Sequence, residues 1–252
     1  RGPPAACPPA TPQPTETPSP TSTPLPTATP PPTHTPTPTS TPTRTPTATP
    51  NREATSQAKA TSTQQVKMDL VAPVLKNMGL STNAGQLVWF EEEPILMMVQ
   101  DYNSFTYTPL GEDQWANYVI HSKITWDSSS GLAGCGMLLR SDGNLDTGKH
   151  YEFDLLRLQN APAWEMFSVK YHYIDKYLTR YKFDNIINDG KLSVNTLEIL
   201  VQGKQFTPYI NGEKKITMEN SDLTEGYIYV IAHQESGLTT CMFENTWVWT
   251  LD

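Results

Sequence analysis

Two acidic residues, Glu152 and Asp154, stand two positions apart in a segment with the composition of a strand. Alternation along a strand over 151–158 places both carboxylates on the same side of a sheet. Paired carboxyl groups carry out glycoside hydrolysis when they lie about 5 Å apart and hold different protonation roles. The next charged residue is Arg157, whose guanidinium does not transfer a proton at neutral pH. Glu152 and Asp154 are therefore the catalytic candidates if the protein is an enzyme.

A second interpretation of the same residues needs no chemistry. Arg140 and Arg157 would pair with Glu152 and Asp154 across neighbouring strands and form the polar face of a half-exposed sheet. In a third interpretation, the same face of the sheet binds a ligand. The sequence favours the polar face over hydrolysis.

Aromatic residues gather in the segment 164–181, which holds Trp164, Tyr171 and Tyr173. Sugar rings stack on exposed aromatic faces while nearby polar groups bind the hydroxyls. The alternative is that several of these rings belong to the core. The predicted ligand-binding set is Arg140, Glu152, Asp154, Arg157, Trp164, Tyr171 and Tyr173.

Oxygen-bearing side chains recur at every second position in Asp142, Asn144 and Asp146, as they do in calcium loops. The segment is not an EF-hand, because Thr147 and Phe153 occupy positions that need glycine and glutamate. These three residues are a weak candidate for structural calcium, and the alternative is an Asx-rich turn between strands. We expect no other cofactor.

The segments that position these residues have the period of two and the β-branched and aromatic content of strands. Asn211-Gly212 tolerates positive φ at both positions and predicts a two-residue hairpin inside a three-strand meander. Pro208 lacks an N–H, so its strand should lie at an edge or contain a bulge. The fold class is all-β, a two-sheet antiparallel jelly-roll sandwich. The predicted strands are 118–126, 135–140, 151–158, 164–173, 196–201, 205–210, 227–233 and 241–251.

The N-terminal quarter of the 252-residue chain differs from the rest, because 18 of its 23 prolines lie in residues 1–50. Residues 1–65 are therefore predicted to be a disordered Thr/Pro-rich stalk, and residues 66–252 a single domain. Helical spacing of apolar residues predicts a short helix over 66–79 with Gly79 as its stop, and Pro73 would be tolerated only in its first turn.

Charge and hydropathy exclude several partners. The formal net charge is −8 and there is no Lys/Arg run, which argues against nucleic acid. No stretch is long and apolar enough to predict a transmembrane segment. Arg1 is not an initiator methionine, so we expect that an upstream part has been removed. Cys7 is either a lipid-bearing tether to the cell envelope or an unpaired or intermolecular cysteine.

Cys135 and Cys241 are the two cysteines of the predicted domain. A secreted context favours a disulfide between them, against the alternative of two buried free thiols. The bond would close the loop between them, and in the chain-entropy model this closure stabilises the folded state by roughly 4–5 kcal/mol.

The C-terminal half resembles the concanavalin A-like lectin/glucanase jelly rolls, including the laminin-G-like and 3-keto-disaccharide hydrolase-like branches. Together with Gly134-Cys135-Gly136, it is also similar to secreted bacterial proteins of the Chloroflexi type that carry this domain behind Thr-Pro linkers. The resemblance covers residues 80–252 and implies the fold more than the function. Glu152 and Asp154 match the first two acidic residues of the Glu-x-Asp-x-x-Glu strand of laminarinase-like members. This chain has Arg157 where those members have the acid/base glutamate, so the resemblance favours a protein without that activity. The motifs are Gln202-Gly203, Phe206, Tyr209-Ile210-Asn211-Gly212, Gly226-Tyr227-Ile228-Tyr229, Phe243-Glu244-Asn245 and Trp247-Val248-Trp249.

The sequence and this resemblance together predict a non-catalytic, extracellular module that binds carbohydrate or another surface polymer from the end of a stalk. One alternative is a glycoside hydrolase of the laminarinase-like or keto-glycoside-cleaving type. The other is a structural or adhesive subunit that associates with copies of itself.

Overall fold

The computed structural model describes residues 52–251 except 101–103, 129–131 and 160, with backbone alone for 52–62. These residues belong to one compact unit, Pro50–Asp252. The predicted stalk lies outside the described residues over 1–51, and so does Cys7.

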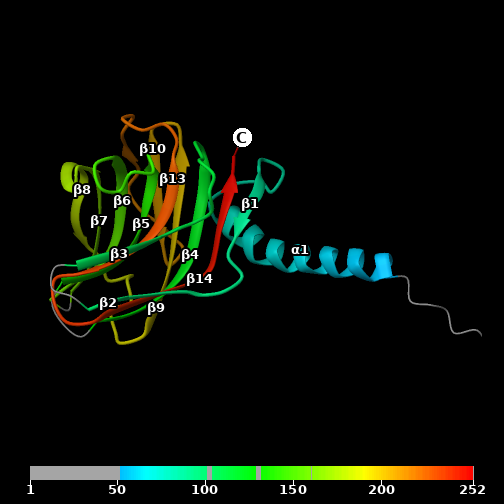
Figure 1. The fold of residues 1–252 in the computed structure, drawn as a ribbon, viewed down its shortest axis with the longest axis horizontal. Coiled ribbons are helices and arrows are strands. Elements are labelled where there is room, and N and C mark those ends of the chain that lie inside the picture. Colours follow the sequence, from blue (N-terminus) through cyan, green and yellow to red (C-terminus); the bar gives the residue numbers. More distant parts are fainter. Residues whose placement is uncertain (1–51, 101–103, 129–131, 160, 252) are drawn as a thin grey trace, which may run out of the picture. The chain divides into compact units, whose positions relative to one another are not determined.

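Two antiparallel sheets form the domain (Figure 1), which confirms the predicted all-β sandwich. The six-stranded sheet has the order β3-β13-β5-β6-β7-β8, and the larger sheet has the order β1-β14-β4-β9-β10-β11 with β2 beside β14 and β12 beside β10. Every pairing between the described strands is antiparallel. In the six-stranded sheet the strands are β3 (Ser104–Pro109), β13 (Tyr227–Gln234), β5 (Leu132–Ser141), β6 (Lys149–Leu158), β7 (Ala161–Lys170) and β8 (Tyr173–Phe183). In the eight-stranded sheet they are β1 (Gln86–Phe90), β14 (Thr239–Thr250), β4 (Tyr118–Ser128), β9 (Ser193–Gln202), β10 (Gln205–Ile210), β11 (Glu213–Lys214), β2 (Ile95–Val99) and β12 (Met218–Glu219).

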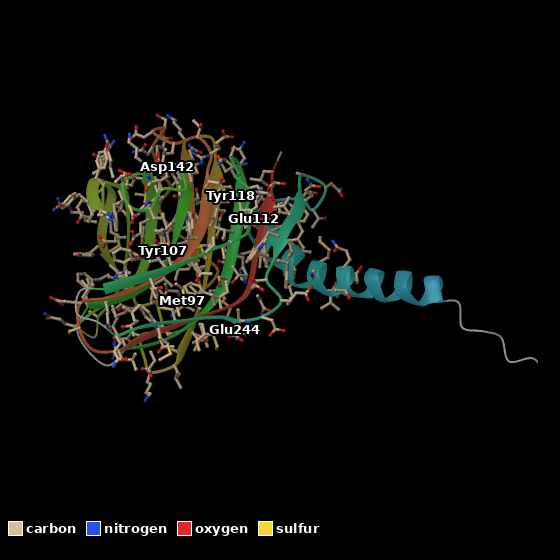
Figure 2. All side chains as sticks on the ribbon, viewed as in Figure 1. Met97, Tyr107, Glu112, Tyr118, Asp142 and Glu244 are labelled. Carbon is tan, nitrogen blue, oxygen red and sulfur yellow. A yellow bond between two sulfur atoms is a disulfide. The ribbon has the colours of Figure 1, made fainter. Side chains whose placement is uncertain are left out.

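The core fills the space between the two sheets, as the side chains in Figure 2 show. Alternate residues of each strand point inward, among them Ile120, Met137, Phe153 and Phe243, which are fully buried. Cys135 on β5 and Cys241 on β14 form a disulfide, which confirms that prediction and joins one sheet to the other through the core.

The hairpin between β10 and β11 has the predicted geometry. Asn211 and Gly212 have φ values of 50° and 78°, as a two-residue turn of this type requires. Pro208 pairs with Ile199 on β9, and on its other side the described neighbours of β10 are the short strands β11 and β12. Its carbonyl accepts a hydrogen bond from Lys215, so the missing N–H faces the interrupted side of the strand, where it costs no ladder hydrogen bond.

The helix α1 (Arg52–Asn77) is longer than predicted, because it begins within the segment assigned to the stalk. The prediction that Pro73 would be tolerated only in the first turn was wrong, since Pro73 lies in the last two turns. Pro73 and Asp69, whose carbonyl loses its helical partner, are both exposed, so water can satisfy that carbonyl. The helix ends at Asn77, and Gly79 acts as its stop as predicted, since it has φ 75° and forms a Schellman cap with Leu80.

The C-terminal part of α1 packs on the outer face of the eight-stranded sheet (Figure 1). Val71 and Leu75 are fully buried there against Val119, Trp247 and Trp249. The helix therefore covers apolar side chains that would otherwise face solvent. Among the described residues, no helix combines the length and hydropathy that a membrane crossing needs.

Candidate functional site

The outer face of the six-stranded sheet contains a strip without side chains. Gly134 and Gly136 occupy the outward positions of β5, while Cys135 between them points into the core. A Cβ atom at residue 134 would lie 2.2 Å from Nε2 of His233, and one at residue 136 would lie 2.3 Å from Oδ1 of Asp154. The glycines thus allow side chains from β13 and β6, which are not neighbouring strands, to meet above β5.

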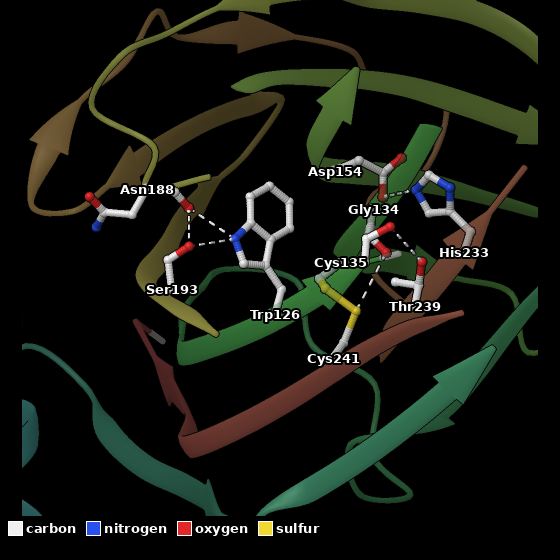
Figure 3. Close-up of a disulfide and its surroundings, with 10 residues drawn as sticks. Trp126, Gly134, Cys135, Asp154, Asn188, Ser193, His233, Thr239 and Cys241 are labelled. Carbon is white, nitrogen blue, oxygen red and sulfur yellow. Dashed lines mark hydrogen bonds and ion pairs between the residues drawn. A yellow bond between two sulfur atoms is a disulfide. The ribbon is translucent and has the colours of Figure 1, made fainter. Parts of the chain in front are cut away.

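Acidic and histidine side chains meet over this strip. Oδ1 of Asp154 lies 3.4 Å from Nε2 of His233 (Figure 3), and Oε2 of Glu152 lies 3.7 Å from Nε2 of His150. Glu165 on β7 stands opposite Asp154 in the strand register and adds a third carboxyl group. As alternation predicted, Glu152 and Asp154 share one face of β6.

These groups form the floor of a groove with a volume of about 430 Å³, which we call the outer groove. Its walls are largely apolar. Phe105 and Tyr107 on β3 are 53% and 40% exposed, and their ring centroids are 6.2 Å apart. The apolar lining residues are Phe105, Tyr107, Leu132, Leu138, Leu145, Phe167, Val169, Ile174 and Ile231.

Burial changes the acidity of the floor. Removal from water, reinforced by the charge of Asp154, raises the pKa of Glu165 to about 8. The pKa of Glu152 is also raised well above its usual value, first by burial and then by Asp154 and Glu165. Glu152 and Glu165 therefore keep their protons to a higher pH than exposed carboxyl groups do.

The two histidines of the floor respond in opposite directions. Burial lowers the pKa of His150 to about 4, because the charges of Asp142 and Asp154 compensate only in part. Burial also opposes protonation of His233, but Asp154 and then Glu165 outweigh it and raise the pKa of this imidazole. His150 is therefore neutral at pH 7, whereas His233 holds its proton more readily than an exposed histidine.

Several buried polar atoms of the floor have unused hydrogen-bonding capacity. Within the described part of the chain, Oε2 of Glu165 and Nδ1 of His150 have no hydrogen-bond partner. Oδ1 of Asp154 has no hydrogen bond either, only the ion-pair contact with His233. Buried polar groups normally find partners, so these atoms indicate a place for a ligand or bound water.

Arg140 and Arg157 lie elsewhere. Arg140 is 1% exposed, donates to the Leu223 carbonyl at 2.9 Å and lies over the ring of Phe206. Arg157 donates through Nη1 to the carbonyl of Ser128 at 3.2 Å. Neither arginine is among the residues that line the outer groove.

The three predicted aromatic residues also lie outside the lining of the outer groove. Trp164 is 3% exposed and its ring stacks on Phe153 in the core. Tyr171 and Tyr173 are well exposed at the turn between β7 and β8. Ligand binding by Tyr171 and Tyr173 stays a prediction.

The predicted calcium loop forms Asx turns. Asp142 accepts hydrogen bonds from the backbone N–H groups of Asn144 and Lys149 at 3.0 and 2.9 Å. Asn144 in turn accepts from the N–H groups of Asp146 and Thr147. Backbone donors thus occupy the oxygens of Asp142 and Asn144, as in the turn alternative, and calcium at this loop stays a prediction.

Sequence reasoning missed Glu165, His150 and His233. One signal was available: Gly134 and Gly136 two positions apart inside an apolar strand indicate a close approach on one face. Once that face is recognised as the site, alternation in β7 selects Glu165 instead of Trp164.

Comparisons with known proteins show similarity to solved structures in fold alone. No protein-family description matches the chain, and neither does any curated protein. Among solved structures, the carbohydrate binding module CBM66 from Bacillus subtilis shares 15% identity over 65% of this chain and 93% of that one, with a TM-score of 0.47. The alginate lyase AlyC3 shares 10% identity over 64% of this chain and 76% of that one, with a TM-score of 0.47. Sheep galectin-11, in complex with glycerol, shares 12% identity over 56% of this chain and 99% of that one, with a TM-score of 0.37. Likeness at this level carries no argument about ligand or activity.

Proposed function

We propose that the outer groove binds a carbohydrate chain. The observation that carries the proposal is the set of buried polar atoms without hydrogen-bond partners, on Glu165 and His150, beneath exposed aromatic rings. Sugars match both parts, because their ring faces stack on aromatic side chains and their hydroxyl groups both donate and accept hydrogen bonds.

The charge of the floor selects among carbohydrates. Glu152, Asp154 and Glu165 present three carboxyl groups to whatever enters the groove. An anionic polymer would bring its charge into a groove whose described lining includes no Lys or Arg to compensate it, at a cost that rises in a buried site. A neutral glycan is therefore the favoured ligand class, and a nucleic acid is disfavoured for the same reason.

The location that we propose is extracellular, with the Thr/Pro-rich segment as the stalk. Support comes from the Cys135–Cys241 disulfide, because such bonds persist mainly in oxidising compartments. In this arrangement the groove would reach a surface polymer, and the rest of the domain would serve as its scaffold.

The test is binding of the full chain to an array of neutral and acidic polysaccharides, followed by calorimetry on the best ligand. We expect Phe105→Ala and Tyr107→Ala each to weaken binding about fivefold, since stacking on one ring is worth roughly 1 kcal/mol. Phe183→Ala is the matched control, because Phe183 is 68% exposed on β8 and does not line the groove. Absence of binding to every neutral glycan, or an equal loss in the control, would contradict the proposal.

A second candidate function, hydrolysis of the bound glycan, is favoured by Glu165. This residue places a carboxyl group on β7 opposite Asp154, although the position on β6 that Arg157 occupies lacks one. Retaining and inverting glycosidases both need two carboxyl groups flanking the scissile bond. Release of reducing sugar that Glu165→Gln abolishes while binding persists would establish an enzyme. Binding without release would establish a non-catalytic module.

A further inference from the structure

We infer that Glu152, Asp154 and His233 form a binding site for one divalent transition-metal ion, Zn²⁺ or Mn²⁺, on the floor of the outer groove. Each of the three residues offers one ligand atom, and all three atoms lie within 4.8 Å of one another. Ligands held about 2.1 Å from a common ion lie roughly 3–4 Å apart, so small side-chain rotations would complete the geometry. The site does not depend on carbohydrate binding.

The backbone brings these ligands together from two strands that are not neighbours. Glu152 and Asp154 occupy alternate positions of β6, whereas His233 projects from β13 on the far side of β5. Because Gly134 and Gly136 place no side chain between them, Asp154 and His233 approach to 3.4 Å (Figure 3). Ligands carried by paired strands are held more precisely than ligands on loops.

The surroundings hold more carboxyl groups than cationic side chains, since the lining of the outer groove includes no Lys or Arg among the described residues. Asp154 is 1% exposed and Glu165 is 6% exposed, and Oε2 of Glu165 has no hydrogen-bond partner among the described residues. The described ion pairs of Glu152 and Asp154 are with histidines. Burying several carboxyl groups is costly unless a cation compensates them, and a metal ion would do so directly. Glu165 would then accept a hydrogen bond from a water on the ion.

The chemistry of the ligands selects the class of metal. One imidazole nitrogen and two carboxylate oxygens suit zinc or manganese, whereas calcium takes six to eight oxygen ligands. Three protein ligands from the floor would leave the remaining coordination positions directed into the groove. Hydroxyl groups of a bound ligand would reach the ion there, as substrates do in open metal sites.

The test is titration of the full chain, after removal of metals with EDTA, with ZnCl₂, MnCl₂, MgCl₂ and CaCl₂ in separate calorimetric experiments. We expect one equivalent of Zn²⁺ or Mn²⁺ to bind, and Glu152→Gln and His233→Gln each to weaken binding at least tenfold. Asp146→Asn is the control, because Asp146 is 86% exposed in the competing loop and should leave binding unchanged. Near-ultraviolet circular dichroism checks that each variant is folded.

A measurement on the unchanged chain keeps the inference testable if a variant does not fold. The chain has five histidines, and we expect Zn²⁺ to shift the imidazole resonances of His233 but not those of His121. Absence of stoichiometric binding, unshifted His233 resonances, or loss of binding in Asp146→Asn alone would each overturn the site. Glycan binding measured in EDTA separates this outcome from failure of the proposed carbohydrate function.

Discussion

The two outer faces of the sandwich differ in what covers them. On the eight-stranded sheet, Trp247 and Trp249 are buried beneath Val71 and Leu75 of α1. On the six-stranded sheet no described helix covers the corresponding face, and buried carboxyl and imidazole groups form the floor of a groove.

The two faces contribute differently to the molecule, because one stabilises the fold and the other holds the candidate site. The covered face removes large apolar side chains from water, which stabilises the folded chain. The open face holds buried polar atoms without partners, which costs stability and is typical of sites that bind something else. We therefore expect substitutions on the covered face to lower the free energy of unfolding, and substitutions on the open face to change it little.

The largest effect is expected from Trp247→Ala on the covered face. Trp247 is fully buried, so its loss should lower the free energy of unfolding by about 3–5 kcal/mol. Phe105→Ala on the open face removes an aromatic ring that is 53% exposed and should change stability by about 0.5 kcal/mol or less. Urea unfolding of both variants measures this, and equal losses would remove the distinction between the faces.

Removal of the disulfide should have the next largest effect, because it joins β5 beneath the open face to β14. The double variant Cys135→Ala, Cys241→Ala should unfold with about 2–4 kcal/mol less free energy than the unchanged chain. Denaturant unfolding under oxidising conditions provides the measurement. A loss below about 1 kcal/mol would show that packing alone holds the two sheets together.

A smaller effect concerns a carboxyl group that has a cation partner. Oδ2 of Asp184 lies 2.7 Å from Nζ of Lys215, whose side chain is 6% exposed. Burial raises the pKa of Asp184, but hydrogen bonds from Lys215 and the Ile186 N–H outweigh it, so the pKa is lowered from 3.8. Asp184→Asn should cost about 1–2 kcal/mol at pH 7.

The pH dependence of that cost has a definite sign. Because the folded pKa lies below the unfolded one, the stabilisation is fully present above pH 3.8 and is lost as the pH falls through the folded pKa. The difference between Asp184→Asn and the unchanged chain should therefore shrink towards zero in acid. A difference that stays constant from pH 7 to strong acid would argue against the ion pair.

The smallest effect is expected from Glu165→Gln on the floor of the groove. In the absence of added metal, this variant should leave the free energy of unfolding unchanged or raise it by up to about 1 kcal/mol. It removes a buried carboxyl group that faces Asp154 and has no hydrogen bond at Oε2. Thermal unfolding in EDTA is the measurement, and a loss above about 1 kcal/mol would mean that Glu165 stabilises the fold.

Much of the fold could be predicted because its signals are local. Period-two alternation identified the long central strands of both sheets but missed β1, β2, β3 and β8, and Asn211-Gly212 identified a hairpin. The cysteine pair followed from its number and context. The N-terminal extent of α1 was missed because residues 52–65 are polar and lack an apolar stripe, and the helix is joined to a packed end that anchors it.

The site was predictable only where it depends on one strand. Alternation placed Glu152 and Asp154 together, but it cannot show that β13 lies beside β5, so His233 was out of reach. Arg140 was misplaced because the pairing of β5 with β13 shifts register near this residue, whose φ of 50° turns its side chain towards Phe206.

Strand β5 has a practical consequence for anyone who makes this protein. Cys135, directly between the two glycines of the groove floor, is the residue bonded to β14. Material produced in a reducing cytoplasm would lack this covalent link beneath the outer groove, and a negative binding result would then reflect the expression host instead of the protein. Thiol titration of each preparation should therefore precede any statement about what the protein binds.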